Sequence, residues 1–323
     1  MKLSALLVGV ALLGACEKGN GGGAGAAVGS DEKAFLQYLP AGETALVGGN
    51  YLKFQDWMNT SPLGKMMGKL SQISPGLTEW TTCFAQFKSV KMLSGVKLAG
   101  SNFDMRMVMS GITLDDIKGC ADKAKFAPTV DADKKWIGLE MPNTVAGTTI
   151  KTGYFVLPNN MIYMHQAMAL TGGATMTPSD RKAAEADIAA LSSGTAEKDT
   201  ALVDAMKSVD RTKPMWFVGN AAGTPAADKV GAVKGWIDIT GGISMDATVE
   251  IKDAAMTDKI IKGVPEMKQQ AGALGGTLAD VVKSLDVSKE GNAVRFKFSI
   301  TNDQLQKLMD QVGPMMGGMF GGH

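Results

Sequence analysis

Two stretches of alternating side chains, far apart in the chain, constrain the fold most strongly. Phe103-Asp-Met-Arg-Met-Val-Met109 and Met245-Asp-Ala-Thr-Val-Glu-Ile251 each place an apolar side chain at every second position. This period of two is typical of antiparallel strands with one buried face. A segment with helical periodicity follows each stretch, over residues 113–124 and 254–271. The chain is therefore predicted to contain two copies of one unit made of strands and a helix.

Shorter pairs of similar segments support this duplication. Val47-Gly-Gly-Asn50 resembles Val218-Gly-Asn220, and Ser89-Val-Lys91 resembles Ala232-Val-Lys234. The patterns predict an α+β protein with two related domains, each a mainly antiparallel sheet with packed amphipathic helices. The predicted divisions are a signal peptide over residues 1–15, a glycine-rich tether over 16–30, a first domain with extra helices over 31–176, a second domain over 177–313, and a disordered Met- and Gly-rich tail over 314–323.

The N-terminus has the layout of a secretory signal. Lys2 supplies a positive charge, residues 3–13 form an apolar run, and two small residues precede Cys16. The apolar run is too short to cross a bilayer as a mature helix, and no later run is long enough. The segment is therefore predicted to direct export and to be removed.

Leu13-Gly14-Ala15-Cys16 resembles the lipobox of bacterial lipoproteins. The resemblance implies that the signal is cut before Cys16, which then carries acyl chains on its sulfur and its new amino group. It also implies a lipid-anchored protein of the bacterial cell envelope, because acyl chains of this kind anchor a protein stably. In that family an aspartate after the cysteine keeps the protein at the inner membrane, so the resemblance, with Glu17 at this position, implies the outer membrane. Residues 39–44, Leu-Pro-Ala-Gly-Glu-Thr, loosely resemble the opening of uncharacterised envelope lipoproteins, which brings no known activity.

The location in the cell envelope that this resemblance implies affects what is expected of the other two cysteines. Once Cys16 is acylated, Cys83 and Cys120 remain, and two thiols in an oxidising compartment most often pair. We expect a structural disulfide between them. A catalytic thiol would need a Cys-x-x-Cys motif or a lowered pKa, and a zinc site would need further ligands at suitable spacing. The sequence shows neither pattern.

The sequence favours a non-enzymatic protein without a cofactor. Nucleophilic hydrolysis needs a base beside serine or cysteine, yet histidine occurs only at positions 165 and 323, and no Gly-x-Ser-x-Gly elbow is present. No Gly-x-x-x-x-Gly-Lys-Ser/Thr or Gly-x-Gly-x-x-Gly phosphate loop occurs. No block of five or six like charges appears, which argues against nucleic acid as a partner.

The expected function is to bind or scaffold a partner at the membrane surface, and two alternatives remain open. The first is a carrier of an apolar or lipid ligand, with Trp57, Met58, Met66 and Met67 as lid residues. The second is Cu(I) binding, because thioethers are soft ligands. The copper candidates are Met315, Met316, Met319 and His323. Against both, methionine also fills ordinary cores.

Overall fold

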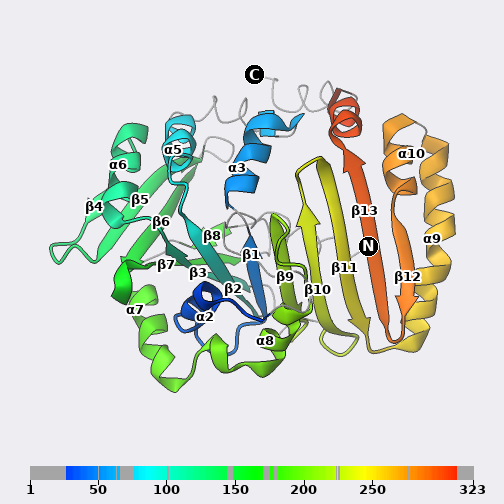
Figure 1. Ribbon diagram of the computed structural model, residues 1–323, viewed down its shortest axis with the longest axis horizontal. Helices are drawn as coiled ribbons and strands as arrows, with labels where there is room; N and C mark the ends of the chain where they lie inside the picture. Colours follow the sequence, from blue (N-terminus) through cyan, green and yellow to red (C-terminus); the bar gives the residue numbers. More distant parts are fainter. Residues whose placement is uncertain are drawn as a thin grey trace.

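The computed structural model describes residues 27–49, 51–62, 64–65, 76–99, 102–143, 148–169, 175–177, 181–222, 224, 226–274 and 276–310. It mixes helices with a large antiparallel sheet, which confirms the predicted α+β class (Figure 1). The strands are β1 (Ala45–Gly49), β2 (Lys91–Ala99), β3 (Asn102–Ser110), β4 (Thr129–Val130), β5 (Trp136–Asn143), β6 (Thr148–Val156), β7 (Ile162–Ala169), β8 (Thr175–Thr177), β9 (Met215–Asn220), β10 (Val230–Asp238), β11 (Gly242–Ile251), β12 (Asp286–Glu290) and β13 (Ala293–Thr301). The helices are α2 (Ser30–Leu36), α3 (Tyr51–Thr60), α5 (Leu77–Phe84), α6 (Leu114–Ala124), α7 (Arg181–Ala190), α8 (Thr200–Lys207), α9 (Ala254–Leu274) and α10 (Gly276–Lys283), with 3-10 segments η1 (Pro158–Asn160), η2 (Leu191–Ser193) and η3 (Ala196–Lys198).

All thirteen described strands belong to one continuous sheet. Its order is β12-β13-β11-β10-β9-β1-β2-β3-β7-β6-β5-β4, and β8 pairs with β7 beside this path. β1 and β9 lie antiparallel at the centre, with Leu46 opposite Val218. The order β11-β10-β9-β1-β2-β3 is symmetric about this central pair, as a duplicated meander would give. The duplication and the division into two domains stay predictions, since one sheet runs through both halves.

Local sequence signals explain where several helices begin. Thr113 caps α6, since its hydroxyl accepts a hydrogen bond from the Asp116 N–H at 3.1 Å and the Asp116 carboxylate accepts one from the Thr113 N–H at 3.0 Å. Thr301 and Gln304 form the same reciprocal pair at the start of the helix over residues 302–310. The helix over residues 113–124 was expected from the helical periodicity of its sequence.

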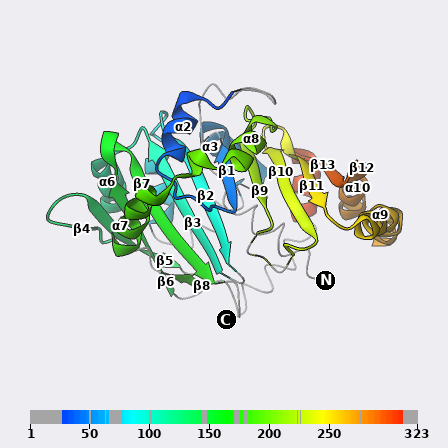
Figure 2. The same cartoon turned by 90° about the horizontal axis from the view of Figure 1, so that it is seen from below.

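Helices cover one face of the sheet only in part. We call the face that carries Tyr163, Leu93 and Trp216 the front face, because α2, which packs on these residues, lies in front of the strands in Figure 1. On this face α2 contacts β2, α7 contacts β6 and β7, and α8 contacts β9. Figure 2 shows α2 and α8 along the same side of the strands. On the opposite face α6 contacts β5 and β6, and α9 contacts β11 and β12.

A single cross-strand row builds the core of the front face. Each residue of this row lies directly opposite the next across the strand pairs: Trp136, Phe155, Tyr163, Val108, Leu93, Gly48, Trp216 and Trp236. The glycine in the row makes room for an indole. A Cβ atom at Gly48 would lie 2.2 Å from Cζ2 of Trp216, so the ring of Trp216 occupies the space of the missing side chain.

Gly48→Ala is expected to lower the free energy of unfolding by about 1–3 kcal/mol, because the added methyl must displace a buried indole. Urea unfolding measures the loss. Gly119→Ala in α6 is the matched control, since nothing lies within 4 Å of a Cβ atom there and alanine favours a helix. Equal unfolding midpoints for the two variants would contradict this packing.

The body of the protein begins inside the predicted tether. Arg211 donates a hydrogen bond from Nη2 to the Ala27 carbonyl at 3.0 Å and forms a buried ion pair with Glu32. Val28 is buried in the front-face core. Residues 27–30 are therefore fastened to the body, although the sequence placed them in the tether.

Candidate functional site

A row of polar side chains lies next to the aromatic row on the front face. His165 of β7 stands opposite Arg106 of β3, and Arg106 stands opposite Gly95 of β2. Glu43, from the segment before β1, lies over Gly95, where a Cβ atom would be 2.8 Å from the carboxyl carbon Cδ. The glycine thus creates the space in which Glu43 is buried beside Arg106. We call Glu43, Arg106, Tyr163, His165 and Asp187 the polar cluster.

Asp187 of α7 joins the cluster from above the strands. Its Oδ1 accepts a hydrogen bond from Nε of Arg106 at 3.1 Å, and its Oδ2 accepts one from the Tyr163 hydroxyl at 2.9 Å. Nδ1 of His165 lies 2.9 Å from the same Oδ2. Nη1 of Arg106 donates to Oε1 of Glu43 at 3.3 Å. The cluster therefore ties together α7, β3, β7 and the segment before β1.

Burial shifts the protonation equilibria of the cluster. The side chain of Glu43 is 1% exposed, and this burial raises its pKa to about 7 even though Arg106 opposes the rise. Burial would also raise the pKa of Asp187, but the contacts from His165, Arg106 and Tyr163 outweigh it and lower that pKa. Burial, reinforced by Asp187, raises the pKa of Tyr163, which stays a neutral hydrogen-bond donor.

Some polar atoms of the cluster have no hydrogen-bond partner in the described part of the chain. Within the described residues, Oε2 of Glu43 and Nε2 of His165 are buried without a hydrogen-bond partner. A buried polar atom without a partner destabilises the protein. Because Glu43, Arg106 and Tyr163 are all buried, the cluster can hold α7, β3, β7 and the segment before β1 together. The strength of these contacts can change when one of its groups gains or loses a proton.

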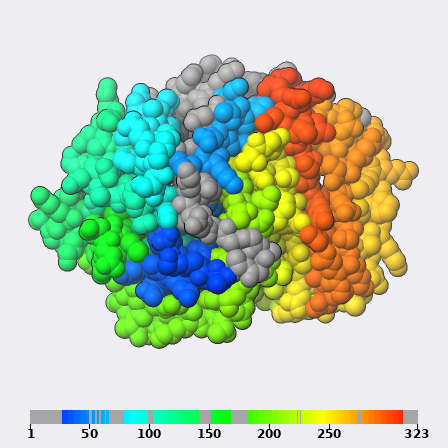
Figure 3. All heavy atoms as spheres, in the orientation of Figure 1, coloured from blue at the N-terminus to red at the C-terminus, as the bar shows by residue number. Residues whose placement is uncertain are grey.

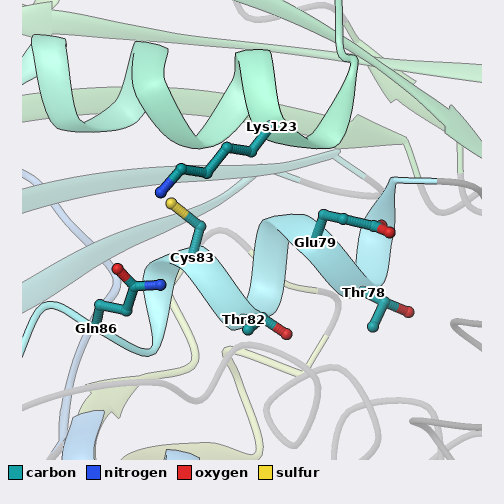
Figure 4. Close-up of a pocket in the computed structure, with 6 residues that line it drawn as sticks. All are labelled: Thr78, Glu79, Thr82, Cys83, Gln86 and Lys123. Carbon is teal, nitrogen blue, oxygen red and sulfur yellow. The ribbon is translucent and has the colours of Figure 1, made fainter.

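The structure pairs Cys83 with Cys120, as expected. The S–S distance is 2.01 Å and the Cα atoms are 5.4 Å apart, so the bond joins α5 to α6. An open hollow of about 440 Å³ lies beside it. Figure 4 shows the residues that line this hollow, with Lys123 reaching from α6 toward α5: Thr78, Glu79, Thr82, Cys83, Gln86 and Lys123.

Several residues predicted from the sequence lie outside the described part of the chain. They are Cys16, Met66, Met67, Met315, Met316, Met319 and His323. Trp57, expected at a lid, is buried. Within the described residues, no group of three or more His, Cys, Asp or Glu is placed to hold a metal ion. The copper and carrier alternatives therefore stay predictions.

The front face of β10, β11, β13 and β12 carries no helix in the described structure, as Figure 1 shows. We call this surface the open face. Arg295 binds Asp246 with two hydrogen bonds, at 2.7 Å and 2.6 Å, and Glu290 with one at 2.8 Å. Lys297 is exposed beside it, opposite Asp246 in register. Figure 3 shows these strands at the surface of the molecule.

The sequence did not single out Glu43, Arg106 or Asp187. One signal was present, an arginine and an aspartate at the polar positions of an otherwise apolar strand, Phe103 to Met109. The sequence offered nothing that joins Arg106 to residues 63 positions before it and 81 positions after it.

No protein family and no curated protein matches this chain. Among solved structures it is distantly similar to crystal form I of TP0453, with 9% sequence identity and a TM-score of 0.41. The similarity covers 86% of this chain and 96% of the other chain. A likeness at this TM-score carries no conclusion about fold or function. Within the described residues, none of the helices is both long and apolar enough to span a membrane.

Proposed function

We propose that the protein is a non-enzymatic, lipid-anchored envelope protein that binds a partner protein at the membrane surface through the open face. The observation that supports this proposal is the contrast along one continuous sheet. α2, α7 and α8 cover the front face of the strands on one side, whereas no helix of the described part of the chain covers the front face of β10, β11, β13 and β12. A rigid sheet loses little conformational freedom when a partner covers it.

The size of the open face suits a transient interaction. Three strands about 30 Å long and the shorter β12, about 17 Å long, lie about 4.8 Å apart and present roughly 500 Å². Stable complexes bury about 800 Å² on each partner, so an interface of this size belongs among the smaller, transient ones. Arg295 is held by Asp246 and Glu290, whereas Lys297 is exposed and, among the described residues, forms no ion pair, so it could meet a carboxylate of a partner. We therefore expect a partner with acidic groups opposite Lys297.

The proposed anchor would keep the open face near the membrane. Cys16 lies eleven positions before Ala27, where Arg211 fastens the chain to the body. A flexible glycine-rich segment of this length spans about 18–20 Å on average. A partner in or on the same membrane would thus meet the open face at a raised local concentration.

The test is site-specific photo-crosslinking in cells. A photoreactive amino acid at Lys297 is expected to form one defined crosslinked product, while the same residue at Lys262, exposed on α9, forms none. Arg295→Glu should weaken the product several-fold, because it removes the cation between Asp246 and Glu290. Equal products from both positions would refute the open face as the binding surface.

Cys16→Ser provides the second arm of this test. It should abolish metabolic labelling with a fatty-acid analogue and reduce the crosslink from Lys297, because the body is no longer acylated. Labelling that persists in Cys16→Ser would refute the lipid anchor and leave the open face to be judged by the crosslinks alone.

A further inference from the structure

Helix α7 covers a strip of aromatic side chains. Trp136, Phe155 and Tyr163 lie side by side across β5, β6 and β7 on the front face. α7 contacts β6 and β7, and its Ala184 is fully buried in the same core. Asp187 is three positions further along α7, so it lies on the same side of the helix as Ala184. The docking of α7 therefore depends on this small apolar contact and on the polar contacts of Asp187. It also depends on Arg181, the first residue of α7, which pairs with Asp131 and Asp133 and lies over the ring of Phe155.

The charges beneath α7 do not balance. One buried guanidinium, that of Arg106, pairs with two carboxyl groups, the buried one of Glu43 and the part-buried one of Asp187. Its third carboxylate neighbour, Asp104, is farther away at 3.9 Å and more exposed. The remaining groups that face Glu43 or Asp187 from the packed elements are Lys97 of β2 and Tyr163 and His165 of β7.

Ionisation of Glu43 would make Glu43 and Asp187 compete for the guanidinium of Arg106. A carboxylate at Glu43 attracts Arg106 more strongly than a neutral carboxyl does, and Arg106 also holds Asp187. The charge would leave Oε2 buried without a hydrogen-bond partner, which is costly unless water reaches it. Both effects favour an arrangement in which α7 moves away and water enters.

We propose that α7 is a proton-controlled latch, closed while Glu43 is protonated and loosened when Glu43 ionises, so that the strip of Trp136, Phe155 and Tyr163 becomes accessible. The latch is independent of the open face, which lies on the other half of the sheet. Its function would be to present an aromatic surface according to the pH outside the membrane.

The direction of the pH dependence follows from burial. The pKa of Glu43 is raised to about 7 in the folded chain, above the ordinary 4.5. The folded state therefore holds the proton more tightly than the open state does. The free energy that this proton contributes to the closed state is fully present below about pH 4.5 and is lost as pH rises through about 7. The lowered pKa of Asp187 keeps that partner ionised across the whole range. The latch is thus closed in mild acid and loosened above neutrality.

Hydrogen exchange of the full chain tests the latch. The protection factors of the α7 amides are expected to fall about tenfold between pH 6 and pH 8.5, if opening returns Glu43 to its ordinary pKa. The amides of α6, which the disulfide fastens, should not change. Glu43→Gln should hold the pH 6 protection of α7 at pH 8.5, whereas the control Glu140→Gln, at an exposed ion pair, should behave as the wild type.

Unchanged protection of α7 in the wild type between the two pH values would overturn the proposal. A tenfold fall that persists in Glu43→Gln would overturn it as well, because another group would then control α7. Asp187→Asn gives a further check, since it should lower the protection of α7 at both pH values by weakening the bond from Arg106.

Discussion

Arg106→Met is expected to lower the free energy of unfolding by about 3–5 kcal/mol at pH 8, because it leaves the buried carboxyl of Glu43 and the part-buried carboxyl of Asp187 without their cation. Methionine fills much of the same volume, so the loss reports the charge more than a cavity. At pH 5.5 the loss should be smaller, since Glu43 is then mostly protonated and only Asp187 loses a charged partner. Urea unfolding at the two pH values measures the difference.

Arg295→Met is the matched control for this experiment. Arg295 also lies on a strand and also binds two carboxylates, but its side chain is 33% exposed, against 9% for Arg106. Exposed ion pairs contribute about 0–1 kcal/mol, so this variant should lose little stability at either pH. A loss of the same size for both arginines would contradict the role of burial in the polar cluster.

Replacing both Cys83 and Cys120 by alanine is expected to lower the free energy of unfolding by about 4 kcal/mol. The bond closes a loop between residues 37 positions apart, and the chain-entropy relation for a loop of that length gives this value. Both cysteines are buried, so the smaller alanine side chains add a modest packing loss. Urea unfolding under oxidising conditions compares the two proteins.

Reductant provides the control for the disulfide prediction. A dithiol reductant should move the unfolding midpoint of the wild type toward that of the double variant, and should not move the midpoint of the variant. A double variant that unfolds at the wild-type urea concentration would show that α5 and α6 are held by packing alone. Aromatic contacts such as Trp80 of α5 with Phe126, just after α6, at 5.7 Å between ring centres, would then carry the contact.

The features that the sequence predicted correctly depend on neighbouring residues. The capping box of Thr113 and Asp116 needs only four consecutive positions, and the alternation of Phe103 to Met109 needs only one strand. Both signals are contained within a few neighbouring residues, so they can be recognised without knowing the fold. The short strand β12 was missed because Asp286–Glu290 is polar and mostly exposed, and only its pairing with β13 makes it a strand.

The candidate sites depended on distant pairings that no local signal encodes. Glu43 is buried because Gly95 of another strand leaves space for it, and Asp187 reaches Arg106 only when α7 lies across β7. Strand register decides such encounters, and register follows from the whole hydrophobic pattern of the sheet. The sequence noticed His165, but not the carboxylate that lies 2.9 Å from it.

The central pairing of β1 with β9 affects the order in which the sheet of this protein is completed during synthesis. Leu46 pairs with Val218, which lies 172 positions later in the chain and is therefore synthesised later. Pairings of such high sequence separation form slowly. Until residues 215–220 arrive, one edge of β1 lies open as a template on which other chains can add a strand. The long interval between these two strands is therefore the time at which a nascent chain most needs a chaperone, and a chain truncated before β9 would keep that edge exposed permanently.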